Sequence, residues 1–175
     1  MTKKVMIGSV AVGGGEKVKI QSMTTCKTSD IEKCAAQTNA LAAAGCDIIR
    51  YAVLDEADAY AIKTLKTKVS IPIVADIHFS PRLAVLAVEN GADKLRINPG
   101  NIGGEKEIAL VADCIKAHHI PVRVGANTGS IEKQFLARYG KSAQALAESA
   151  LYNAAILKLL YGFTLQIPSA VDHLV

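Results

Sequence analysis

The chain has 175 residues, with 20 Lys and Arg against 16 Asp and Glu, which gives a net charge of +4. At about 100–200 residues per domain, this length indicates one domain or part of one. Half of the residues are hydrophobic but only 5% are aromatic, as is typical of helices packed on a buried parallel sheet rather than of a β-sandwich. A membrane-spanning helix needs about 20 consecutive apolar residues, and no apolar run in the sequence approaches this length. The mild charge forms no continuous basic run, which argues against a nucleic-acid groove.

The chain has four cysteines: Cys26, Cys34, Cys46 and Cys114. Their spacings match neither a zinc site nor the common iron–sulfur motifs. We expect them to be reduced and mostly buried, as in a cytoplasmic protein, and we expect no metal site. The amino end shows no small-residue cleavage site, so a secretion signal is not expected.

Short β-rich runs alternate with helical ones along the chain. The sequence predicts a hairpin turn at 13–15, strands at 18–23, 47–53, 71–77, 94–98 and 121–126, and helices at 30–44, 55–68, 80–91, 104–118, 130–140 and 142–161. Asp30 is the expected N-cap of the first helix, Ser80 precedes Pro81 in the order of a helix start, and Ser130 is the expected N-cap of the helix at 130–140. Five such βα units predict a parallel sheet, which a doubly wound fold and a (β/α)₈ barrel both satisfy.

Polar residues cluster near the carboxyl ends of the predicted strands. Side chains alternate along a strand with period two, so Asp76 and His78 share a face. Arg96 shares a face with Asn98, and Arg123 shares one with Gly125 and, if the strand extends that far, Asn127. Arg50 lies near the end of the strand at 47–53. In a barrel this face is the mouth, where active sites lie. In a doubly wound sheet both faces carry helices, and repeated arginines are hard to place, so the pattern favours the barrel.

Three arginines that point toward one mouth repel each other unless an anion joins them. Guanidinium groups match phosphate oxygens in bidentate fashion. The sequence therefore predicts a site for a small phosphorylated or diphosphorylated substrate. Its residues are Arg50, Asp76, His78, Arg96, Asn98, Arg123, Asn127 and Ser130, with His78 as an acid–base or ligand-binding candidate. The alternative is an internal salt-bridge layer, for example between Asp76 and Arg50 or Arg96.

Two further features bear on the chemistry. The segment 98–104 is predicted as a flexible loop without the Gly-Lys-Ser/Thr of a phosphate loop, although its backbone amides could approach a phosphate at the following helix start. No lysine stands at the carboxyl end of a strand, which argues against Schiff-base chemistry. The sequence shows no Ser-His-Asp or metal-ligand cluster, so no catalytic residue is assigned.

Four segments resemble a known family: KIQSMT at 19–24, VADIHF at 74–79, LRINPGNIG at 95–103 and VRVGANTGSIEK at 122–133. They are similar to the N-terminal barrel of IspG, also called GcpE, the 4-hydroxy-3-methylbut-2-enyl diphosphate synthases of the non-mevalonate (MEP) isoprenoid pathway. The resemblance runs in order from about residue 5 to residue 163.

The resemblance implies a two-part bacterial, cytoplasmic oxidoreductase. A TIM barrel binds 2-C-methyl-D-erythritol 2,4-cyclodiphosphate, and a separate domain carries a [4Fe-4S] cluster. Ferredoxin or flavodoxin supplies electrons for reductive ring opening, and in the homodimer one barrel faces the other subunit's cluster domain. The family's diphosphate contacts correspond to Arg50, Arg96, Asn98, Arg123, Asn127 and Ser130, with Asp76 and His78 lining the same pocket. From the composition we expect no membrane and no nucleic-acid partner.

The chain also departs from the family. The family's next strand carries a Val-Lys-Ala-Ser type motif, whereas no lysine follows Lys158, and 164–175 does not resemble the family. We therefore expect an incomplete barrel of about five βα units plus a possible sixth strand at 1–163, a divergent tail at 164–175, and no iron–sulfur domain. A frameshift or premature end of the coding sequence is one explanation. On this interpretation the chain binds no cluster and is inactive alone. The alternatives are an inactive remnant, or another phosphate-binding barrel such as a pterin-synthase-like transferase.

Overall fold

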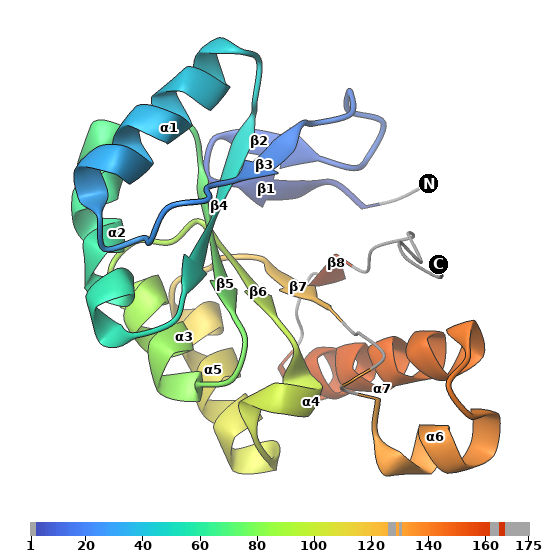
Figure 1. Cartoon of the computed structure of the whole chain (residues 1–175). Helices are drawn as coiled ribbons and strands as arrows, with labels where there is room; N and C mark the ends of the chain where they lie inside the picture. Colours follow the sequence, from blue (N-terminus) through green and yellow to red (C-terminus); the bar gives the residue numbers. More distant parts are fainter. Residues whose placement is uncertain (1–2, 126–128, 130, 162–164, 167–175) are drawn as a thin grey trace.

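A computed structural model describes residues 3–125, 129, 131–161 and 165–166 (Figure 1). The strands are β1 (Val5–Ile7), β2 (Val10–Val12), β3 (Gln21–Met23), β4 (Ile48–Val53), β5 (Ile73–Ile77), β6 (Lys94–Ile97), β7 (Val122–Val124) and β8 (Leu165–Gln166). The helices are α1 (Ile31–Ala43), α2 (Glu56–Lys68), α3 (Pro81–Glu89), α4 (Pro99–Ile102), α5 (Glu105–Ala117), α6 (Lys133–Tyr139) and α7 (Ala143–Tyr161). None of the helices in these ranges is long and apolar enough to cross a membrane.

The order of the strands decides between the two folds that the sequence left open. Strands β3 to β8 form one sheet in chain order, and each neighbouring pair is parallel. A doubly wound sheet reverses its strand order at a switch point, and no reversal occurs here among the described strands. The sheet is therefore part of a (β/α)₈ barrel, with five βα units and a short sixth strand, as predicted.

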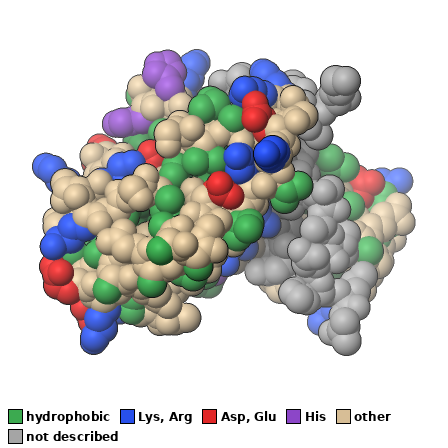
Figure 2. Space-filling model, turned by 90° about the horizontal axis from the view of Figure 1, so that it is seen from above, with side chains coloured by type: hydrophobic (Ala, Val, Ile, Leu, Met, Phe, Trp, Pro, Cys, Tyr) green, Lys and Arg blue, Asp and Glu red, His purple; other side chains and the backbone are tan. Residues whose placement is uncertain are grey.

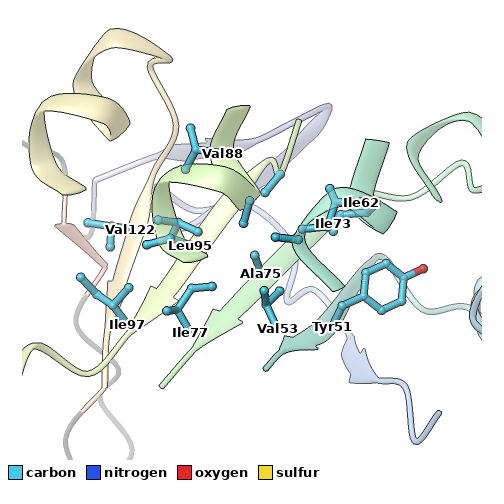
Figure 3. Packing of buried hydrophobic residues seen from close by; sticks show 14 of the residues in the cluster. Tyr51, Val53, Ile62, Ile73, Ala75, Ile77, Val88, Leu95, Ile97 and Val122 are labelled. Atoms are coloured by element: carbon cyan, nitrogen blue, oxygen red, sulfur yellow. The ribbon is translucent and has the colours of Figure 1, made fainter. Parts of the chain in front are cut away.

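The outer face of the sheet forms the main hydrophobic core. Ile49, Ala75, Leu95 and Val122 come from four neighbouring strands and are fully buried. Figure 3 shows side chains of β4, β5, β6 and β7 on one face of the sheet, beside those of Ile62 and Val88 from α2 and α3. Each fully buried aliphatic side chain contributes about 1.5–3 kcal/mol of transfer free energy. This layer fixes which strand faces meet the helices, and therefore which side chains must point into the barrel.

Short polar side chains set the starts of three helices. Asp30 accepts a hydrogen bond from the backbone of Lys33, and Asp55 accepts one from Asp58. The hydroxyl of Ser80 accepts one from Leu83, with Pro81 in the first turn. These contacts satisfy amides that have no partner inside the helix, and they confirm the helix starts that the sequence predicted.

The start of α6 differs from the prediction. The helix was expected to begin after Ser130, but its N-cap is Glu132, with extended dihedral angles, and the helical residues begin at Lys133. Ile131 is buried just ahead of this start, which keeps the chain extended for longer than the polar pattern indicates. Ser130 itself lies outside the described residues.

The segment after β6 also differs. The sequence predicted a flexible loop at 98–104, but Pro99–Ile102 forms the short helix α4. Ile102 is 2% exposed and packs in the core cluster. Burial of this one apolar side chain gives the segment a fixed path that its Pro and Gly content does not show.

An amino-terminal hairpin closes the inner face of the sheet from one end. Strands β1 and β2 pair antiparallel, and Ile7 packs on Ile48 and Val74 of the inner face. The tight turn lies at Gly8, whose φ of +53° suits glycine. A second turn does lie at 13–15, where the amide of Glu16 donates to the carbonyl of Gly13 at 3.1 Å, but it follows β2 and is not the hairpin turn that the sequence predicted. The hairpin leaves the carboxyl ends of the strands as the open end of the inner face.

Candidate anion-binding site

Four of the predicted polar side chains, those of Arg50, Asp76, Arg96 and Arg123, lie on one face of the sheet. Asp76, Arg96 and Arg123 are direct neighbours in the register of β5, β6 and β7. Arg50 is paired in register with Val74 on β5. Val74 is the inward-facing residue that precedes Asp76, so Arg50 lies two residues nearer the amino end of the sheet than Asp76 does. Neighbours in register point to the same side of a parallel sheet. The inner face therefore carries a polar layer toward the carboxyl ends of its strands, and this layer borders the apolar contact that Val74 makes with Ile7 and Ile48.

Asp76 is the centre of this layer. Its side chain is only 3% exposed, and its two oxygens contact different cations. Oδ2 lies 3.3 Å from Nε of Arg50, and Oδ1 lies 3.0 Å from Nη1 of Arg96. A buried carboxylate needs such partners, because charge in the interior costs several kcal/mol when it is not compensated. Asp76 therefore sets the positions of two arginines from two different strands.

The salt-bridge layer that the sequence offered as an alternative is thus present, and its geometry leaves room for a binding role. Arg50 contacts Asp76 through Nε, and Arg96 contacts it through Nη1. A guanidinium carries five N–H donors, so neither contact takes up the whole fork. One carboxylate compensates two guanidiniums here, and a further anion at the open end would complete the neutralisation.

Met23 completes the surroundings of Arg50. The sulfur of Met23 lies 3.2 Å from Nε and 3.1 Å from Nη2 of Arg50. Met23 is also the register neighbour of Arg50 on β3. The thioether is a weak acceptor, so it guides the guanidinium without adding charge.

Gly125 makes room for Arg96. A Cβ built at Gly125 would lie 2.9 Å from both Nε and Nη2 of Arg96. The backbone amide of Gly125 donates to the carbonyl of Ile97 at 2.8 Å, which continues the ladder beyond β7. Any side chain at this position would force the guanidinium away from the backbone. The close approach is the physical reason for glycine at this position.

The remaining predicted site residues are placed as follows. Nε2 of His78 lies 3.6 Å from Oδ1 of Asp76, at the more exposed end of the layer. Asn98 is 3% exposed, and its carbonyl accepts a hydrogen bond from the amide of Asn101 at the start of α4. Asn127 and Ser130 lie outside the described residues, so their placement in the site stays a prediction.

Lys94 is a cation of the inner face that the polar-end argument did not select. It is 3% exposed and pairs in register with Val74. Burial, with a further contribution from the charge of Arg123, lowers the pKa of Lys94 from 10.5 to about 8. Period-two parity from Arg96 places Lys94 on the same face, so the signal was present. It was overlooked because Lys94 lies at the start of its strand.

The amide at the start of α5 is already engaged. The amide of Gly104 donates to Oε2 of Glu107 at 3.0 Å. Gly103 has a φ of +133°, and a Cβ there would meet the side chain of Glu107 at 2.9 Å. The glycine pair therefore allows Glu107 to cap its own helix, and a carboxylate stands where a phosphate could otherwise approach.

The cysteines do not fit the ligands of a metal cluster. Cys46 directs its thiol to the carbonyl of Ile48 at 3.1 Å. Cys26 and Cys34 have their sulfurs in contact, whereas Cys114 lies on α5, far from both of them in the sequence. Within the described ranges no three His, Cys, Asp or Glu side chains come together in a way that could hold a metal ion.

The surface seen from above has mixed charge. In Figure 2, Lys and Arg side chains lie among Asp, Glu and apolar ones, and the described residues of this face form no continuous basic patch. A nucleic-acid-binding surface needs such a patch. The concentrated positive charge of the chain lies instead on the inner face of the sheet.

The fold and the inner face together define a class of protein: part of a (β/α)₈ barrel whose inner face carries an arginine-rich candidate site. Comparison with known proteins narrows this class. The model of the GcpE TIM-barrel domain family matches residues 2–170. The chain belongs to this family.

Curated relatives agree with this assignment. The chain is 51% identical over 159 residues to a 4-hydroxy-3-methylbut-2-en-1-yl diphosphate synthase (flavodoxin) of Caldicellulosiruptor saccharolyticus, and 53% identical over 161 residues to one of Desulfotalea psychrophila. Each match covers 90% of this chain but only 46% and 44% of those proteins. The chain thus spans less than half the length of these relatives.

Solved structures show the same architecture at low identity. A dihydropteroate synthase of Xanthomonas albilineans matches with a TM-score of 0.63 and 14% identity, over 98% of this chain and 66% of that one. A phospho-2-dehydro-3-deoxyheptonate aldolase of Thermotoga maritima matches with a TM-score of 0.67 and 14% identity, over 95% of this chain and 45% of that one. At this identity the likeness supports the fold alone.

Proposed function

We propose that this chain supplies the substrate-binding barrel of a 4-hydroxy-3-methylbut-2-en-1-yl diphosphate synthase. Its ligand is the cyclic diphosphate 2-C-methyl-D-erythritol 2,4-cyclodiphosphate. The observation that carries the proposal is the pair of arginines, Arg50 and Arg96, held at the open end of the inner face by one buried carboxylate, Asp76. The names of relatives at 51% and 53% identity support the same activity.

The electrostatics of the inner face suit a diphosphate. Arg50, Arg96 and Arg123 come from three strands and share one face, while Asp76 supplies a single negative charge between the first two. Hydrogen bonds from guanidinium to phosphate are charge-assisted and often bidentate. In the proposal Asp76 orients the arginines, the arginines bind the diphosphate, and Asn98, Asn127 and Ser130 add neutral hydrogen bonds. His78, beside Asp76, lines the same pocket.

The reductive step belongs to the whole enzyme in this proposal. An iron–sulfur cluster supplies electrons for ring opening when it is bound, but the cysteines of this chain do not fit its ligands. The residues described here bind and orient the diphosphate, and we assign them no redox step. The electron donor, flavodoxin or ferredoxin, and the homodimer with a facing cluster domain are further parts of the proposal. Flavodoxin appears in the names of the relatives. We also propose a cytoplasmic location.

The transferase alternative receives less support. The dihydropteroate synthase structures are 14% identical to the chain or less, far below the identity to the diphosphate synthases. The likeness to them shows how the strands are arranged and carries no information on the ligand.

Calorimetry with the cyclic diphosphate, and with pyrophosphate as a simpler probe, tests the proposal. The variant Arg96→Ala should bind at least about 10-fold more weakly, because a hydrogen bond to a charged group contributes roughly 1.5–3 kcal/mol. The matched control is Arg82→Ala. The side chain of Arg82, on α3, is 71% exposed and pairs with Glu56 of α2. This control should bind as the unaltered chain does.

Circular dichroism of both variants separates a binding defect from a folding defect. If Arg96→Ala is folded and its affinity is unchanged, the arginines do not bind the diphosphate and the proposal fails. If the unaltered folded chain shows no heat of binding for either ligand, the proposal fails as well.

A further inference from the structure

Two cysteine sulfurs lie almost at bonding distance beside the carboxyl end of β3. Cys26 lies in the loop that follows β3, and Cys34 lies near the start of α1. Their Sγ atoms are 2.7 Å apart, which is roughly 0.7 Å longer than a disulfide bond. Two thiols this close can form a disulfide with little movement of either residue.

The surrounding contacts hold the two sulfurs in this arrangement. Gln37 accepts hydrogen bonds from the amide of Thr25, at 3.0 Å, and from the thiol of Cys26, at 3.4 Å. The thiol of Cys34 donates to the carbonyl of Lys27 at 3.2 Å. Farther along the loop, Thr28 donates to the carbonyl of Ala52 on β4 at 2.6 Å. The loop is therefore fixed to α1 and to the sheet on both sides of Cys26.

The two thiols differ in their access to solvent. Cys34 is fully buried, whereas Cys26 is half-buried. Burial, together with the hydrogen bond and charge of Cys26, raises the pKa of the Cys34 thiol to about 12. Because the thiolate is the reactive form, an oxidant from solvent meets Cys26 first, and Cys34 follows as the resolving sulfur.

The other two cysteines lack this arrangement. The thiol of Cys46 points to the carbonyl of Ile48, and the thiol of Cys114 lies 3.9 Å from Nδ1 of His118. Of the four cysteines, Cys26 and Cys34 are the pair with sulfurs in contact.

We propose that Cys26 and Cys34 form a reversible disulfide when the chain meets a peroxide. The Cys26 thiol releases its proton, and the thiolate attacks one oxygen of hydrogen peroxide. The O–O bond breaks, a sulfenic acid forms, and the departing hydroxide takes up the released proton to give one water. The sulfur of Cys34 then attacks the sulfur of Cys26, loses its proton and displaces the second water. Two thiols lose two electrons and two protons, and the peroxide is reduced to two waters. Reduction by a dithiol restores the pair.

Peptide mapping of the full-length chain tests this reaction. Trypsin places Cys26 in the peptide 20–27 and Cys34 in the peptide 34–50, which also contains Cys46. The Cys46→Ala variant therefore makes the assignment unique. After brief peroxide treatment, denaturation and alkylation, one linked peptide lacking two hydrogens should replace the two alkylated peptides. Dithiothreitol should restore both of them.

The Cys34→Ala variant is the matched control. It should yield no linked peptide, and its Cys26 should accumulate as a sulfenic acid that dimedone traps. The proposal is overturned if Cys46→Ala chains, with native circular dichroism, keep both thiols alkylatable under peroxide. It is equally overturned if Cys26 is trapped by dimedone to the same extent whether or not Cys34 is present. Neither result depends on diphosphate binding.

Discussion

Replacing Lys94 by methionine should stabilise the folded chain at neutral pH. Methionine keeps the length of the side chain and removes its charge from a position that is 3% exposed. Burial and the nearby charge of Arg123 lower the pKa of Lys94 from 10.5 to about 8. At about 1.4 kcal/mol per pKa unit, the charged form costs the folded state about 3 kcal/mol. The variant does not bear this cost.

The pH dependence has a definite sign. Between about pH 8 and 10.5 the unfolded chain keeps the proton of Lys94 and the folded chain has lost it, so the stability of the unaltered chain rises with pH in this window. Below pH 8 the cost is fully present, and above 10.5 it disappears. The advantage of Lys94→Met should therefore shrink across the same window.

Urea denaturation of both chains at several pH values from 7 to 11 measures this difference, since other titrating groups cancel between them. Two stability curves that stay parallel from pH 7 to 11 would refute the reasoning, because a pH-independent offset reports packing and not charge. The slope of the denaturation curve should be the same in both chains.

Two further changes test the glycine positions. Gly125→Ala places a methyl group 2.9 Å from the guanidinium of Arg96. We expect little loss of stability, because the long arginine side chain can move, but about a 10-fold loss of pyrophosphate affinity, measured by calorimetry. An unchanged affinity would contradict the proposed role of the close approach. Gly8→Ala adds a Cβ at a φ of +53° and 2.9 Å from the carboxylate of Asp93, whereas Gly45→Ala adds one at +96° in open space. Both should lose about 1–2 kcal/mol from the left-handed backbone, with a further loss for Gly8→Ala alone; equal urea midpoints would show that the contact with Asp93 has no cost.

Much of the fold and of the candidate site follows from local rules. The three polar caps Asp30, Asp55 and Ser80 mark helix starts through a hydrogen bond that lies within four residues of sequence. The sequence predicts one face for Asp76 and Arg96 because period two places each of them opposite the apolar residues of its own strand, which pack on the helices. Such rules need no knowledge of distant contacts, so the sequence alone predicts them.

Contacts between distant segments were the part that the sequence could not predict. The backbone of Gly125 lies close to the guanidinium of Arg96 on a neighbouring strand, and no pattern within 121–126 shows this. The segment of α4 has Pro and Gly in a turn-like order, yet the burial of Ile102 against distant core residues makes it helical. The predicted boundary at residue 163 stays a prediction, because 162–164 and 167–175 lie outside the described residues.

The hairpin at the amino end of the inner face affects how strongly diphosphate binding should depend on ionic strength. Ile7 packs on Ile48 and Val74, and Val74 is the direct register neighbour of both Arg50 and Lys94. Salt ions screen exposed charges over roughly 8–10 Å when water surrounds them on all sides. Here an apolar layer keeps water and ions from one side of the cations, and the sheet itself covers another. Diphosphate binding at this site should therefore weaken less with added salt than binding to lysines and arginines on an open surface.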